Sequence, residues 1–246
     1  EIMTKRLCRQ IGFGKPLLFW GFSLAFGLSR RTSMCSALSS HILSLLYNQY
    51  YFIFAILPIL LFFCGSVMED DPIIFVLRYG SYKHYFTSKW RSLGVLCSGL
   101  WLGQITILFV TGAGLSVIKQ GWDNFSGSSL LKEIAPLLVK SFPGAWVAVF
   151  CAAVYMLMGY WLIALLTLWL GHFLQRQKAI KVLLALYILT ILSIKLPIMS
   201  RPPFCYLTGI NHWVLLLHNL TAGWRFPLTV IVTLLFVVTV ICSIQG

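Results

Sequence analysis

The five histidines are the side chains in this sequence best able to hold a metal ion, but their spacing is not that of a metal site. Neither an i, i+4 pair nor an H-E-x-x-H pattern, which would place two imidazoles on one helix face, occurs among His41, His84, His172, His212 and His218. We therefore expect these histidines at interfaces or in loops, and we expect no metal site.

Acidic residues and serines offer no catalytic constellation. None of the six acids falls in the middle of a long apolar run, which argues against a carrier that moves protons through an intramembrane carboxylate. The chain has no G-x-S-x-G turn and no G-x-x-x-x-G-K-[ST] loop to cradle nucleotide phosphates. We expect no catalytic residue, no enzyme activity and no cofactor on this chain, so that any ATP-driven role needs a partner.

The cysteines are widely separated and form no C-x-x-C pair. Most lie inside apolar runs, where a free thiol behaves as a small hydrophobic side chain. We therefore predict buried cysteines, and neither a disulfide framework nor a zinc site, at Cys8, Cys35, Cys64, Cys97, Cys151, Cys205 and Cys242.

Charge is concentrated in one segment, residues 68–93, between two long apolar runs. It holds three acids, four basic residues and one histidine, together with several aromatic residues. Asp71 and Pro72 have the pattern of a helix N-cap followed by its first residue, and Gly80 has the pattern of a helix end. We expect a short helix at about 72–80, followed by a helix that Ser81 caps and that leads into the next apolar run. The alternative is an interfacial loop that anchors to lipid headgroups.

Composition places these segments in a membrane protein. Hydrophobic residues make up 59% of the 246 residues and charged residues 10%, and the mean hydropathy is +0.87. A water-soluble globule does not have this composition. The net charge of +13 does not indicate nucleic acid, because the basic residues are scattered at the ends of apolar runs.

We predict an all-α integral membrane protein in which residues 1–246 form one transmembrane domain with six transmembrane helices. A basic amphipathic N-terminal segment, residues 1–15, is expected as an interfacial helix. Residues 32–46 are expected as a polar lead-in, 119–140 outside the bilayer, and 201–225 as a re-entrant or interfacial outer segment before the last helix. The spans are expected at about 15–31, 47–67 with a kink at Pro58, 93–118, 145–170, 180–199 and 226–244.

The basic residues also give an orientation. With the N-terminus inside, inner segments hold 11 Lys and Arg and outer segments hold 8. Residues 69–91 and 176–181 share a side and together hold seven of them, so we place both in the cytoplasm.

The segment between the second and third spans resembles the coupling-helix region of the membrane subunits of type-2 ATP-binding-cassette (ABC) exporters. The resemblance rests on Glu69, Leu77, Gly80, Ser81, Tyr85 and Lys89, and on the layout of nearly the whole chain. Asp70-Asp71-Pro72 departs from it, because many members have a Gly-Thr pair there.

The resemblance implies a permease subunit of an ABC exporter that works with a second permease chain, as a homodimer or a heterodimer, and with a separate ATPase subunit that holds ATP and Mg. The cargo implied is an amphipathic peptide, a lipid-like molecule or a drug, and the location is the plasma membrane of a bacterium. The residues that would contact the ATPase are Ile73, Leu77, Arg78, Tyr79, Gly80, Ser81, Tyr82 and Lys83.

Three other classes of function remain open at this point, one of which is a structural or assembly protein. A substrate-capturing membrane subunit of a vitamin importer is also a small six-span protein driven by a partner ATPase, but it would bind its ligand tightly alone. A membrane-embedded enzyme is the third class, and the lack of paired acids or a histidine cluster argues against it.

Overall fold

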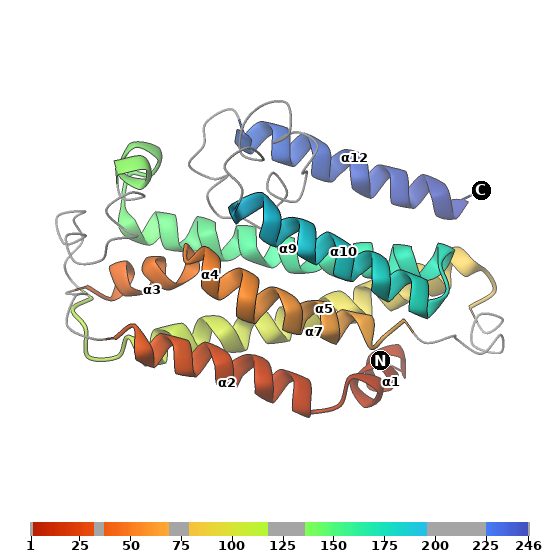
Figure 1. The fold of residues 1–246 in the computed structure, drawn as a ribbon, viewed down its shortest axis with the longest axis horizontal. Coiled ribbons are helices and arrows are strands. Elements are labelled where there is room, and N and C mark those ends of the chain that lie inside the picture. The colour runs from red at the N-terminus through yellow and green to blue at the C-terminus, as the bar shows by residue number, and fades with distance from the viewer. Residues whose placement is uncertain (1, 32–36, 69–78, 118–135, 196–224, 246) are drawn as a thin grey trace.

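The computed structural model describes residues 2–31, 37–68, 79–117, 136–195 and 225–245 (Figure 1). Over these residues the protein is helical and has no strand beyond an isolated bridge between Ala37 and Ser116. Two of its helices are long and apolar enough to cross a membrane, and up to four spans result if each of two bent helix pairs counts as one. The fold is consistent with an all-α membrane protein.

The helices follow the sequence in a simple order. They are α1 (Ile2–Ile11), α2 (Gly14–Ser29), α3 (Leu38–Leu46), α4 (Gln49–Tyr51), the π-helix η1 (Phe52–Ile56), α5 (Leu57–Gly65), α7 (Tyr82–Thr111), α9 (Ala145–Phe173), α10 (Arg176–Lys195) and α12 (Arg225–Gln245). Residues 136–141 are also helical.

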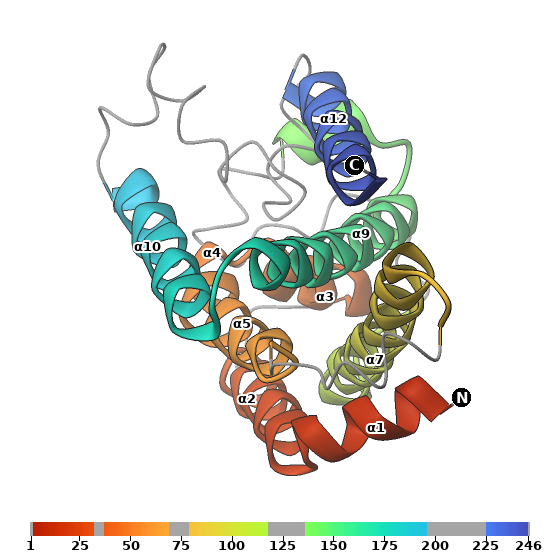
Figure 2. The same cartoon turned by 90° about the vertical axis from the view of Figure 1, so that its right-hand side faces the viewer.

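The longer helices run along one axis and form a bundle. We call its two ends the α1 end and the α3 end. The α1 end holds α1, the start of α7, the junction of α9 with α10 and the end of α12, whereas α2 finishes and α3 begins at the α3 end (Figure 1). Helix α9 lies in the centre and packs against α3, α5, α7 and α10 (Figure 2).

Helix α1 is amphipathic and turns away from α2 by 67°. Met3, Leu7 and Ile11 are buried, and α1 packs on α7, while Lys5 and Arg9 point to the outside. Gly12, with φ of 70°, makes the turn between the two helices, because a left-handed backbone conformation favours glycine. The chain thus has the separate amphipathic N-terminal helix that the sequence predicts.

The polar lead-in expected at 32–46 is wrong for its second half, because α3 is a buried helix. Ser40 and Ser44 donate to the carbonyls of Ala37 and His41, each at 2.7 Å, so these hydroxyls need no water. The bend between α3 and the helix over 49–65 is 51° and falls before Asn48, whose side chain accepts a hydrogen bond from the Tyr51 amide at 3.0 Å.

Pro58, where the sequence predicts a kink, is not the main bend of this segment. The main bend of this strongly apolar segment lies about ten residues earlier, at Asn48, and the helix continues through Pro58. The π-helix η1 directly precedes the turn that contains Pro58. Both a π-helical turn and a proline depart from the regular α-helical hydrogen-bond pattern.

Helices α7 and α10 begin earlier than the predicted spans, and α7 ends earlier. The Ser81 Oγ accepts from the His84 amide at 3.3 Å, so Ser81 is the N-cap of α7, as predicted. Gly112 ends α7 seven residues before the predicted end, and Gly114 follows with φ of 89°. The expected basic link of Arg176, Lys178 and Lys181 lies within the first turns of α10.

Two predicted segments fall largely outside the described residues. The first is the re-entrant stretch expected at 201–225, of which only Arg225 is described, as the first residue of α12. The second is the segment 119–140, of which residues 136–140 are described and are helical. The ranges of α2, α9 and α12 lie within three residues of the predicted spans.

Glycines on α7 receive tryptophan side chains from its neighbours. Trp20 of α2 lies against Gly103, and its indole donates to the Leu100 carbonyl at 3.2 Å. Trp161 of α9 lies against Gly94 and donates to the Ser98 hydroxyl at 2.9 Å. Small residues let helices approach closely inside a membrane, and the indole N–H finds a partner on the same surface.

The Trp20 contact gives a direct test of this packing. In the variant Gly103→Ala the new methyl group would overlap the Trp20 indole, so we expect the free energy of unfolding to fall by about 1–3 kcal/mol. The matched control is Gly99→Ala, one turn away on α7, where nothing lies within 4 Å of the added carbon. Titration with SDS in mixed micelles measures both, and an equal effect of the two variants would contradict the packing.

Candidate functional site

Residues 79–84 form an ordered surface at the α1 end of the bundle, which we call the terminal surface. Gly80 has φ of 70°, and the chain bends there before Ser81 caps α7. Lys83 and His84 are exposed in the first turn of α7, and Tyr79 and Tyr82 are half-buried. The terminal surface thus presents polar and basic groups above tyrosines that pack inward.

Aromatic contacts hold the terminal surface against α9. The Tyr82 ring lies 4.6 Å from the His172 ring, between centroids, and 6.1 Å from the Tyr85 ring. Tyr79 meets Tyr85 edge to face at 5.6 Å, and its hydroxyl accepts from Ser88 at 3.4 Å. The start of α7 is thereby fixed to the end of α9.

The described part of the α1 end carries positive charge. Lys83 and Arg91 are exposed, whereas Lys89 is buried with its Nζ 5.8 Å from the centroid of the Tyr85 ring. No described residue is acidic, because all six Asp and Glu of the chain fall outside the described ranges. The described groups of this surface are therefore basic or hydrogen-bonding, while Glu69, Asp70 and Asp71 of the preceding segment lie outside the described residues.

The structure describes five of the eight residues predicted to contact an ATPase. Tyr79, Gly80, Ser81, Tyr82 and Lys83 lie together on the terminal surface. Ile73, Leu77 and Arg78 lie outside the described residues, as does the short helix expected at about 72–80 except for its last two positions. His172, which supports Tyr82, was not predicted, and it is 90 residues away in the sequence.

A second polar feature lies in the centre of the bundle. Tyr160 donates to the Gln104 side-chain oxygen at 2.5 Å, and the Gln104 amide nitrogen donates to the Tyr51 hydroxyl at 3.1 Å. Tyr51 donates to Ser23 at 2.7 Å, and Ser23 donates to the Phe19 carbonyl at 2.9 Å. This polar chain joins α9, α7, α4 and α2.

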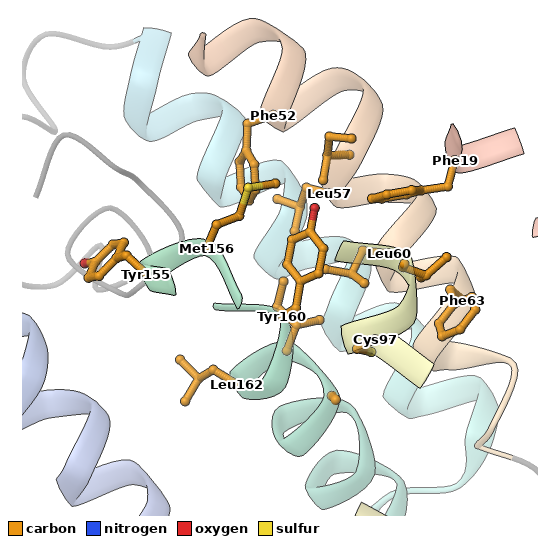
Figure 3. Close-up of a cluster of buried hydrophobic side chains, with 14 of the residues drawn as sticks. Phe19, Phe52, Leu57, Leu60, Phe63, Cys97, Tyr155, Met156, Tyr160 and Leu162 are labelled. Carbon is orange, nitrogen blue, oxygen red and sulfur yellow. The ribbon is translucent and has the colours of Figure 1, made fainter. Parts of the chain in front are cut away.

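The polar chain has one direction because its last member, the Phe19 carbonyl, can only accept. Ser23 must donate to that carbonyl, so its oxygen is left to accept from Tyr51, and each earlier group follows in turn. Apolar side chains enclose it, and Phe52, Leu57 and Leu60 surround the Tyr160 ring (Figure 3). Because each of its side chains is satisfied, the polar chain holds four helices in register.

The histidines and cysteines depart from expectation in part. His41 is fully buried in the bundle, with its Nε2 3.3 Å from the Thr111 hydroxyl. Cys64 and Cys97 are buried as predicted, with sulfurs 3.9 Å apart, whereas Cys8 and Cys242 are exposed. No group of three or more His, Cys, Asp or Glu that could hold a metal ion occurs in the described part of the chain.

The chain was compared with protein-family models, curated proteins and solved structures. No family model matches the chain, and no curated protein and no solved structure matches it.

The polar chain predicts a specific loss of stability. Tyr160→Phe leaves the Gln104 oxygen without its donor, so we expect the free energy of unfolding to fall by about 0.6–1.7 kcal/mol, from the average to the largest value for a hydrogen bond between membrane helices. Tyr187→Phe on α10 is the control, because the described residues show no hydrogen bond to that hydroxyl. SDS titration measures both variants, and a loss no larger for Tyr160→Phe than for Tyr187→Phe would contradict the role of the polar chain.

Proposed function

We propose that this chain is the permease subunit of an ATP-driven ABC exporter and that the terminal surface is part of its contact with a separate ATPase subunit. The observation that carries the proposal is the construction of the terminal surface, where Lys83 and His84 stand exposed on a base of packed tyrosines. ATP and Mg would be held by the partner, because the sequence has no phosphate-binding loop of its own.

The tyrosines favour a protein contact over simple anchoring to lipid headgroups. Aromatic anchors at a membrane interface extend their rings among the headgroups. Here Tyr85 is 2% exposed, and Tyr82 packs on His172. These rings hold the start of α7 in place, so that the basic side chains above them form a fixed surface that a partner can recognise.

The same helices that carry the terminal surface lead to the centre of the bundle. From Tyr82 and His172, α7 and α9 run side by side through the contact of Gly94 with Trp161 and the hydrogen bond from Tyr160 to Gln104. A displacement of the terminal surface by a closing ATPase would therefore reach the polar chain through two rigid helices. This is the route we propose for coupling ATP hydrolysis to transport.

The second permease chain is proposed to cover the apolar surface of α2 and η1. The exposed aromatic side chains of these two elements include Phe22 and Phe54. An aromatic and apolar lining between two permease chains, identical or related, suits an amphipathic peptide, a lipid-like molecule or a drug as cargo.

In this proposal α2, the bent helix from α3 to α5, α7, α9, α10 and α12 are the six transmembrane passes. The α1 end then faces the cytoplasm of a bacterium, and α1 lies on the inner surface of its plasma membrane. Arg31 fits the opposite side, because it donates to the Ala113 carbonyl at the finish of α7 at 2.7 Å.

Capture of the ATPase tests the proposal. We expect the tagged chain, purified from its native membranes in mild detergent, to retain a protein with a phosphate-binding loop that hydrolyses ATP. Arg78→Ala with Tyr79→Ala, and separately Lys83→Glu, should reduce the retained ATPase at least tenfold, because each removes groups from the contact. Lys140→Glu, which changes an exposed lysine at the α3 end, is the matched control.

Two results would contradict the proposal. One is that no ATPase is retained by the unchanged chain, and the other is that the variants at 78, 79 and 83 retain as much as Lys140→Glu. Native mass spectrometry of the isolated chain separates the vitamin-importer alternative, which requires a tightly held small ligand in the absence of any ATPase.

The orientation of the bundle has its own test. Lys83→Cys and Lys140→Cys place exposed thiols at opposite ends of the bundle, in a background with Cys8→Ser and Cys242→Ser. An impermeant maleimide added to intact cells should label position 140 and spare position 83, and inverted vesicles should show the reverse. Peptide mass spectrometry identifies the labelled site, and labelling of position 83 from outside would overturn the orientation.

A further inference from the structure

A cavity of about 390 Å³ lies on the flank of the bundle between the α1–α2 turn, α5 and α10. Its lining changes character along its length. Lys15, Ser66 and Arg176 line it at the α1 end, whereas Pro58, Leu184 and other apolar residues line it further along α5 and α10. The cavity is therefore amphipathic, with a basic mouth and an apolar interior.

The N-termini of two helices add positive electrostatic potential at the mouth of the cavity. Lys15 lies in the first turn of α2 and Arg176 is the first residue of α10, and neither helix has an acidic residue in its first turn. A helix N-terminus carries a partial positive charge that acidic side chains normally offset. Here basic side chains add to it at both N-termini, so the mouth favours an anion.

Lys15 is positioned over the cavity by two contacts. Its Nζ donates to the Ile11 carbonyl at 2.9 Å and lies 5.0 Å from the centroid of the Phe62 ring on α5. The ammonium group is thereby held between the two helices, on the apolar wall that Phe62 contributes. An anion at the mouth would meet a charge that is already in place.

The length of the cavity indicates the kind of anion. Arg176 and Tyr187 both line it, and the 11 residues between them along α10 correspond to about 16 Å at 1.5 Å per residue. This is about half of the 30 Å thickness of a bilayer core, which is the depth of one leaflet. A soluble anion would fill the mouth and leave the apolar interior empty.

We infer that this cavity binds one anionic phospholipid, with its phosphate group at Lys15 and Arg176 and an acyl chain along Phe62 and Leu184. Basic pockets between transmembrane helices on the cytoplasmic side recognise lipid headgroups by this combination of charge and depth. The inference does not depend on an ATPase partner, because it rests only on the cavity, its two basic residues and its apolar wall.

Native mass spectrometry of the purified full chain tests the inference. The probe is an equimolar mixture of phosphatidylglycerol and phosphatidylcholine with identical acyl chains, and we expect one phosphatidylglycerol to be retained in preference. Lys15→Gln with Arg176→Gln should weaken its binding about thirtyfold, at roughly fivefold for each basic residue. Lys178→Gln with Lys181→Gln, which removes equal charge from α10 outside the cavity, should leave binding unchanged.

A second variant separates the cavity from general surface charge. Leu184→Trp keeps every charge and fills the apolar interior, so it should also reduce lipid retention, while its elution in size-exclusion chromatography shows that the chain is folded. Equal retention of the two lipids, an equal loss in both double variants, or full retention in Leu184→Trp would overturn the inference. Displacement of the lipid by inorganic phosphate would also overturn it, because the site would then be one for a soluble anion.

Discussion

The hydrogen-bonded chain from Tyr160 to the Phe19 carbonyl is the interaction on which the arrangement of this bundle depends. Inside a bilayer, apolar side chains gain little by moving from lipid to protein, so helices need close packing and hydrogen bonds to fix their positions. Four helices meet in this chain, and each donor has one acceptor. The glycine and tryptophan contacts of α7 bring the backbones close enough for the chain to close.

The bend before Asn48 follows from the same constraint. Tyr51 must point its hydroxyl at both Ser23 and Gln104, and its amide is satisfied by the Asn48 side chain at the start of α4. A straight helix from α3 into α5 would have no break at which Asn48 could act as an N-cap. The bend also lets α3 stay buried, with His41 against Thr111 at the finish of α7.

The sequence was most informative where charge marked the ends of helices. Arg30 and Arg176 lie at or next to helix ends that the charge pattern predicted within a few residues. Helix α3 was missed because its serines and His41 resemble a polar lead-in, and their partners are carbonyls of the same helix and a threonine 70 residues away.

The residues of the candidate sites also divide into those that local sequence predicts and those that depend on contacts between distant segments. Ser81 was predictable as a cap because the pattern is local, and the structure places it there. Gln104 was not predicted, although a lone amide in an apolar run is a usable signal, because its partners are 53 and 56 residues away. His172 and the basic mouth at Lys15 and Arg176 likewise depend on contacts between distant segments.

Two groups of basic residues at the α1 end differ in what lies beneath them. Lys83 stands above packed tyrosines, and this arrangement is the basis of the protein contact that we propose there. Lys15 and Arg176 stand above an apolar cavity that is deep enough for an acyl chain. The proposed protein contact requires the α1 end to face the compartment with ATP, and the inferred lipid site requires it to face the leaflet with anionic lipids. In a cell this compartment and this leaflet are both cytoplasmic, and the count of basic residues also predicts that the α1 end is cytoplasmic.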